Sequence, residues 1–217
     1  GALVWQQRYN NGKPDEAMQL SLDSLGNPVI AGYSQHATYN FLVARYHAGT
    51  GDVMALTVLD GPMNSSDASW DMVLVDGGKP ILTGTSYSAN GAFDGYTLKF
   101  GCACLDSTIP VKWGTRFSAD ANKQDQMVAI SADLYGNPVV AGYGQNEDGS
   151  FDAYTAKYRS ADGSVIWQTQ MDGPGGRNDF PRDIISDPSG NVFVAGYAAS
   201  DSGSTDFWIT HYIPTLE

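Results

Sequence analysis

Hydrophobic and polar side chains alternate with a period of two in several short segments of the chain. Residues 17–22 (AMQLSL) and 40–46 (NFLVARY) show this alternation, and residues 29–33 (VIAGY) form a short apolar run rich in small and β-branched residues. Such patterns are typical of β-strands, because successive side chains of a strand point to opposite faces of a sheet. We find no segment of helix length with a period of 3.6 residues. The pattern predicts an all-β protein.

The same pattern of strands and turns recurs four times along the chain. The cores of the four copies read SLDSLGNPVIAGYS, VLVDGGKPILTGTS, SADLYGNPVVAGYG and SDPSGNVFVAGYA. Their turn residues are spaced by 52, 58 and 54 residues: Asn27, Lys79, Asn137 and Asn191. We therefore divide the chain, 1–217, into one domain of four approximate repeats: 1–52, 53–109, 110–164 and 165–217.

Two kinds of residue keep a constant distance from this turn, and two more, in the third strand, keep a constant distance of five residues from each other. An aspartate lies 12 residues before it: Asp15, Asp67, Asp125 and Asp179. A glycine lies five residues after it: Gly32, Gly84, Gly142 and Gly196. An acid or amide opens the third strand: Asn40, Asp94, Asp152 and Asp206. A basic or imidazole side chain lies near the end of that strand: Arg45, Lys99, Lys157 and His211.

Four short strands in a repeat of about 54 residues are typical of a β-propeller blade. The repeated elements, a Trp-led strand, the Asp-x-x-Gly-Asn turn, the V-x-G-Y-S run and a strand that ends in Lys-Tyr, closely resemble the bacterial seven-bladed-propeller repeat (SBBP) and are similar to the delta-sixty repeat. The resemblance covers all four copies and is weakest in the second. It implies secreted or cell-surface bacterial proteins, often large and modular, without enzymatic activity.

By this resemblance, the strand order within a blade runs from the centre of the propeller outward. Residues 17–22 are expected innermost, 28–34 second, 40–47 third, and the Trp-led strand outermost. The chain then begins with an outermost strand (5–9) and ends with a third strand (206–212). We expect the N-terminal strand to complete the last blade and to close a four-bladed ring, since pairing removes exposed strand edges. A half-ring that pairs with a second chain and a fragment of a longer protein are the alternatives.

Composition and charge exclude some classes of function. The chain has 24 acidic and 12 basic residues, a net charge of −12 and a pI near 4.4. Binding to nucleic acid needs clustered Lys and Arg, so no nucleic-acid partner is expected. No apolar stretch reaches the roughly 20 residues of a membrane helix. The chain opens at Gly1 without a signal-like segment, so we expect a processed product or a fragment of an exported protein.

The repeated acids are the candidate metal ligands. Loops at alternate strand ends share one face of a propeller, so the acids before the first strand and those that open the third should gather there. One interpretation is a Ca²⁺ site; the other is that each aspartate caps a turn of its own blade. The candidate ligands are the third-strand acids and two loop acids: Asp94, Asp152, Asp206, Asp148 and Asp201.

The basic residue at the end of the third strand lies too far from the acid at its start to pair with it, because five residues of strand span roughly 17 Å. We expect it to pair with the aspartate of the hairpin turn, as Arg45 with Asp23 and Lys157 with Asp133.

A few single residues are candidates for other chemistry. Trp70 lies beside an innermost strand and either packs in the core or stacks on a sugar. His36, in a loop on the acidic face, is a further candidate for ligand binding. Cys102 and Cys104 are expected to form a local disulfide in an exported protein, with free thiols as the alternative. No catalytic motif is present, and no catalytic residue is assigned.

These observations predict a non-catalytic, exported propeller that binds a protein partner or assembles with itself at a bacterial surface. The alternative is a carbohydrate-active propeller, either a lectin or a glycoside hydrolase or lyase, that uses the acidic face with Ca²⁺ as a candidate cofactor.

Overall fold

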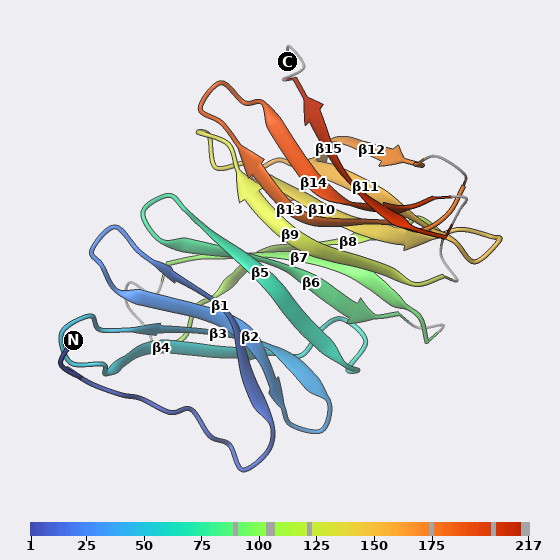
Figure 1. Cartoon of the computed structure of the whole chain (residues 1–217). Coiled ribbons are helices and arrows are strands. Elements are labelled where there is room, and N and C mark those ends of the chain that lie inside the picture. The colour runs from blue at the N-terminus through green and yellow to red at the C-terminus, as the bar shows by residue number, and fades with distance from the viewer. Residues whose placement is uncertain (89–90, 103–106, 121–122, 174–175, 201–202, 214–217) are drawn as a thin grey trace.

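The computed structural model describes every residue except 89–90, 103–106, 121–122, 174–175, 201–202 and 214–217. The described residues form fifteen antiparallel strands in four sheets, which follow one another along the chain (Figure 1). Blade 1 holds β1 (Asp15–Leu22), β2 (Pro28–Gln35), β3 (Tyr39–Tyr46) and β4 (Val53–Leu59). Blade 2 holds β5 (Asp67–Val75), β6 (Lys79–Tyr87), β7 (Phe93–Phe100) and β8 (Val111–Phe117). Blade 3 holds β9 (Asp125–Ala132), β10 (Pro138–Gln145), β11 (Phe151–Tyr158) and β12 (Val165–Met171), and blade 4 holds β13 (Asp179–Ser186), β14 (Val192–Ala199) and β15 (Thr205–Tyr212).

The all-β prediction and the strand order within each blade are confirmed. Each sheet is a meander in which consecutive strands pair, with the strand that opens the repeat at one edge. The described residues contain no helix long and apolar enough to cross a membrane.

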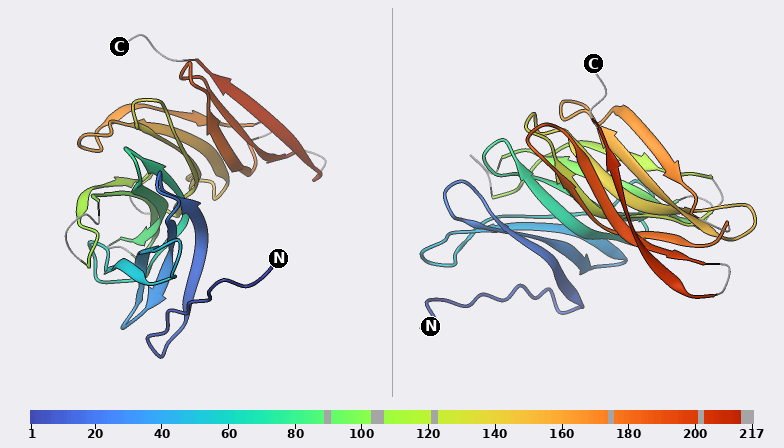
Figure 2. Two further views of the ribbon diagram at one scale, coloured as in Figure 1. Left: turned by 90° about the vertical axis from the view of Figure 1, so that its left-hand side faces the viewer. Right: turned by 45° about the horizontal axis from the view of Figure 1, so that its top comes forward.

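The predicted closure of the ring is wrong for this structure. Residues 5–9 belong to no strand, and blade 4 has three strands, with β15 at its edge. The blades form an open arc, and the two ends of the chain lie at opposite ends of that arc (Figure 2).

The N-terminal segment is held at blade 1 by Trp5. Its indole N–H donates to the Ala48 carbonyl at 2.8 Å, and its ring lies against Gly51. Trp113 of β8 makes the same contacts with blade 3, where it bonds the Ser160 carbonyl and covers Gly163. The segment therefore occupies the place of the outermost strand of a blade that would precede blade 1, far from β15.

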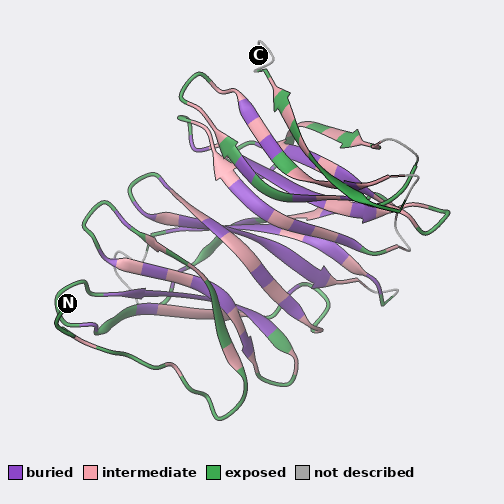
Figure 3. Cartoon of the chain, in the orientation of Figure 1, coloured by how far each residue is buried: buried purple, intermediate pink, exposed green. Residues whose placement is uncertain are grey.

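Each blade packs one face against the first strand of the next blade. We call this its forward face and the opposite one its rear face. Phe41 and Val43 of blade 1 thus form one core with Met72 of β5, and Val139 of blade 3 forms another with Ile184 of β13. The core of the protein is a series of such layers between blades, and the buried residues are concentrated in the second and third strands of blades 1 to 3 (Figure 3).

The repeated glycine allows the first two strands of a blade to approach closely. In every blade the register of these strands shifts at a bulge next to this glycine. A Cβ atom on Gly142 would lie 2.0 Å from the backbone oxygen of Gln126, and Gly32 would meet Glu16 at 1.9 Å. Only glycine fits at this position, which explains its presence in all four copies.

The predicted ion pairs between the third strand and the hairpin turn are confirmed. Lys157 pairs with Asp133 at 2.8 Å, and the Arg45 side chain lies 3.7 Å from Asp23. Lys99 instead reaches Asp76, the acid of the altered turn in blade 2.

Replacing Gly142 by alanine tests the role of the close approach. We expect Gly142→Ala to lower the free energy of unfolding by about 3 kcal/mol, since the new methyl group meets backbone that cannot move aside. Urea unfolding followed by tryptophan fluorescence measures the change. Gly49→Ala is the matched control, because the added Cβ meets only the exposed His47 ring, at 3.4 Å. Equal stabilities of the two variants would contradict this account.

Candidate functional sites

The repeated aspartate lies at the start of the first strand of each blade. It bonds the backbone of the crossover that leads from the preceding blade. Its carboxylate accepts a hydrogen bond from the backbone N–H six residues earlier, just after the outermost strand. These bonds measure 2.7 Å from Gly61 to Asp67, 3.2 Å from Ala119 to Asp125 and 2.7 Å from Gly173 to Asp179. All three aspartates are buried. The aspartate therefore serves as a turn cap at each boundary between blades.

The structure brings the acid that opens the third strand next to this capping aspartate of the following blade. Burial raises the pKa of Asp125 to about 7, and the negative charge of Asp94 adds to this rise. Burial also raises the pKa of Asp179, with further contributions from Asp152 and Asp172. The sequence predicts that these acids lie on one face of the propeller, and the structure groups them in pairs across the blade boundaries.

The pairs differ in how their charge is balanced. Asp94 forms an ion pair with Arg116 of β8. Asp152, at the equivalent place in blade 3, accepts a hydrogen bond from the neutral Gln170 of β12. Among the described residues, one group of acids is close enough to share a metal ion, and it consists of Asp152, Asp172 and Asp179.

The other predicted metal ligands do not join this group. Asp148 is exposed, and hydrogen bonds from the Ser150 side chain and backbone hold its pKa below the usual range. Asp206 is exposed on β15. Asp201 lies outside the described residues.

The remaining candidates are separate from one another. The exposed His36 lies at blade 1, where its Nε2 is 3.4 Å from the Asn11 amide and its carbonyl accepts a bond from Lys13. Cys104 lies outside the described residues, so its disulfide with Cys102 stays a prediction.

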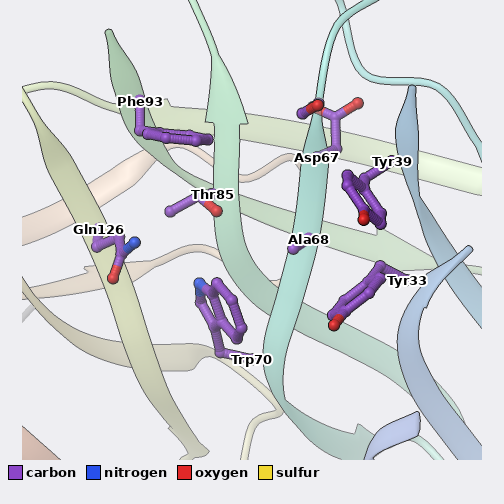
Figure 4. Close-up of a pocket in the computed structure, with 9 residues that line it drawn as sticks. Tyr33, Tyr39, Asp67, Ala68, Trp70, Thr85, Phe93 and Gln126 are labelled. Atoms are coloured by element: carbon purple, nitrogen blue, oxygen red, sulfur yellow. The ribbon is translucent and has the colours of Figure 1, made fainter. Parts of the chain in front are cut away.

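Trp70 lines a pocket of about 230 Å³ between blades 1, 2 and 3 (Figure 4). Three other aromatic side chains form its walls: Tyr33, Tyr39 and Phe93. The indole nitrogen of Trp70 is buried, without a hydrogen-bond partner among the described residues, and Figure 4 shows it on the side of Gln126. The pocket thus combines an aromatic lining with an unsatisfied donor.

The pocket exists because two residues of blade 2 are small. The tyrosine after the repeated glycine, as in Tyr143, is Thr85 in blade 2, and its partner on the first strand, Gln126 in blade 3, is Ala68. In blade 3 these two side chains bond each other at 2.5 Å. The sequence carried this signal, since the second copy reads TGTS where the first reads AGYS.

The raised pKa of Asp125 predicts a pH-dependent loss of stability. The unfolded chain ionises this group near pH 3.8 and the folded chain near pH 7. Between these values the folded state binds the extra proton, so the contribution of Asp125 decreases as the pH rises, by up to about 4 kcal/mol. Asp125→Asn mimics the protonated form and should be more stable than the wild type at pH 8, with little difference at pH 4. Urea unfolding at both pH values measures this, with Asp148→Asn as control; an unchanged difference between pH 4 and pH 8 would contradict it.

Comparison with known proteins supports the propeller fold. A crystal structure of a protein of unknown function from Dyadobacter fermentans DSM 18053 superimposes with a TM-score of 0.52 at 11% sequence identity. The match covers 88% of this chain and 58% of that chain, so this chain spans somewhat more than half of its length. No curated protein sequence matches this chain. Residues 173–203 match the family described as SBBP, a β-propeller repeat. The chain therefore carries one matched SBBP propeller repeat, at residues 173–203 in blade 4 and the crossover before it.

Proposed function

We propose that this protein is a non-catalytic assembly module of a bacterial surface or extracellular structure, and that it binds a second copy of itself through the two ends of the arc. The observation that carries the proposal is the exposure of apolar side chains at the two end faces, at positions that are buried elsewhere in the repeat. Location outside the cell is the part of the proposal that rests on the SBBP resemblance.

The forward face of blade 4 is apolar and exposed. Phe207 and Ile209 of β15 are 90% and 68% exposed. The residues that correspond to Ile209 in the other blades are all buried: Val43, Thr97 and Thr155. Ile185 of β13 adds a third exposed apolar side chain, and a shallow hollow separates it from Ile209. In the other blades, the equivalent surface packs against the first strand of the following blade.

The rear face of blade 1 supplies such a first strand. Leu20 of β1 is 60% exposed, whereas its counterparts are at most 6% exposed because a preceding blade covers them: Met72, Ile130 and Ile184. Covering Leu20 and Ile209 removes large apolar area from water, which favours association.

The two faces are complementary in the way that each blade is complementary to the next. Blade 4 of one copy can receive β1 of a second copy, which brings residues 5–9 of that copy beside the free edge of β15. Those residues already occupy the place of an outermost strand, held by Trp5. Two arcs joined at both ends would form a ring of eight blades, within the range of about 4 to 8 known for propellers.

Charge substitutions on the two faces test the head-to-tail arrangement. We expect the wild-type chain to form a dimer, and Leu20→Glu and Ile209→Glu each to prevent it, since a buried unpaired charge is costly. An equimolar mixture of these variants should form a heterodimer, because each retains the face that the other has lost. Size-exclusion chromatography with light scattering over a range of concentrations measures the mass.

The control for this experiment is Leu134→Glu. Leu134 is 73% exposed at the hairpin turn of blade 3, away from both end faces, so this variant should dimerise like the wild type. A wild-type chain that is monomeric at every concentration, or variants that stay monomeric when mixed, would overturn the proposal.

The Trp70 pocket favours a second candidate function, the binding of a sugar. Aromatic rings pack against the apolar faces of sugar rings, and the buried indole N–H, which has no partner among the described residues, could donate to a ligand. This function is compatible with assembly, because the pocket lies between inner strands of blades 1 to 3.

A glycan array tests the second candidate. We expect the wild type to bind a restricted set of glycans and Trp70→Ala to bind them about tenfold more weakly, through the loss of one stacking contact. Tyr135→Ala removes an exposed aromatic ring outside the pocket and should bind like the wild type. An array without any bound glycan, or equal binding by Trp70→Ala, would exclude this function.

A further inference from the structure

The boundary between blades 3 and 4 holds three carboxylates in close contact. Asp152 lies on β11, Asp172 directly follows β12, and Asp179 begins β13. One oxygen from each lies within 4.8 Å of the others. Asp152 and Asp179 are 3% and 1% exposed, whereas Asp172 is open to solvent. Two of the three carboxylates are therefore buried, and the third is accessible to solvent.

Hydrogen bonds satisfy only some of these oxygens. One oxygen of Asp152 accepts from the Gln170 amide, and one of Asp179 accepts from the Gly173 N–H at 2.7 Å. The other oxygen of Asp152, Oδ1, is shielded from solvent and has no donor among the described residues. A buried carboxylate oxygen without a partner is costly. Asp94 Oδ1 and Asp125 Oδ1 at the preceding boundary share this feature, so the difference between the two boundaries lies in their charged neighbours.

The equivalent boundary between blades 2 and 3 shows how the same pair of acids is balanced without a ligand. There, Arg116 forms an ion pair with Asp94, and Ser118 shares a hydrogen bond with Asp125. At the boundary between blades 3 and 4, the position of Arg116 is occupied by the neutral Gln170 and that of Ser118 by a third acid, Asp172.

The boundary between blades 1 and 2 lacks the carboxylate of the third strand. Its third-strand residue is the amide Asn40, so Asp67 has a single acidic neighbour, Asp60, at the position equivalent to Asp172. The boundary between blades 3 and 4 thus brings three acids together, with the neutral Gln170 at the position that Arg116 occupies at the preceding boundary.

We propose that Asp152, Asp172 and Asp179 bind one Ca²⁺ ion, which takes the place of the arginine found at the preceding boundary. Ca²⁺ prefers oxygen ligands at 2.3–2.6 Å, so two oxygens bound to one ion lie at most about 5 Å apart, in agreement with the observed grouping. It accepts six to eight ligands, and water can supply the remainder on the open side at Asp172.

Two further features fit this site. A Cβ atom on Gly173 would lie 2.3 Å from Asp179 Oδ1, so glycine keeps the space around that oxygen free. Because the three acids come from β11, β13 and the crossover after β12, a bound ion would fasten blade 4 to blade 3.

Calorimetric titration of the EDTA-treated protein with CaCl₂, together with thermal unfolding, tests the site. We expect one ion per chain and a rise in Tm of about 5–10 °C at a hundredfold excess over Kd. Gln170→Arg should weaken Ca²⁺ binding at least tenfold, because it introduces the guanidinium that balances the preceding boundary. Its Tm in EDTA should equal or exceed that of the wild type, which separates loss of binding from loss of folding.

Two other variants complete the experiment. Asp172→Asn removes the exposed ligand and should weaken binding without unfolding the protein, while Asp148→Asn, at an exposed acid outside the group, should bind like the wild type. The double variant R116Q/S118D gives the boundary between blades 2 and 3 the same three acids and the same amide, and should bind a second ion. Absence of Ca²⁺ binding by the wild type, or wild-type affinity in both Gln170→Arg and Asp172→Asn, would overturn the proposal.

Discussion

Burial of the forward face of one blade by the first strand of the next is the interaction on which the rest of the structure depends. A single four-stranded sheet of this size cannot bury both of its faces, so its stability comes from the neighbouring blades. The close approach at Gly142 and its counterparts, the capping aspartates and the tryptophans that cover the outer turns all lie at these contacts. They are repeated because the contact is repeated.

This dependence explains why the two ends of the arc differ from its middle. Leu20 and Ile209 occupy repeat positions that are buried in the other blades. They are exposed because no neighbouring blade covers them. Their exposure is thus a property of their place in the arc and not of their chemistry. In the proposed assembly, both end faces would be buried by the same contact that joins successive blades within the chain.

Departures from the repeat indicate where individual blades differ in what they can bind. Ala68 and Thr85 replace a larger bonded pair and leave the pocket beside Trp70. Gln170 and Asp172 replace a balancing arginine and a serine, which leaves three acids together. The repeat sets the fold, and the places where one copy deviates are the candidate sites.

Much of the fold could be predicted from the sequence, since strand alternation, turn glycines and constant spacings are local signals. The pairing of Lys157 with Asp133 followed from the length of a strand alone. The closure of the ring was predicted wrongly, because the sequence shows which strand is missing from the last blade but not whether the arc curves enough to bring residues 5–9 to it. The acidic group at Asp152 was only partly foreseen, since the position of Asp172 is acidic in one other copy only, at Asp60, and Asp172 reaches the group through the crossover.

The sequence by itself determined the blade, its four-strand order and the residues that hold it together, because these depend on contacts within about 54 residues or on their repetition. The tertiary structure decided which blade faces remain open, which acids meet across a boundary and where a pocket forms. These features arise between blades, from the angle at which successive sheets pack. No single repeat contains that information.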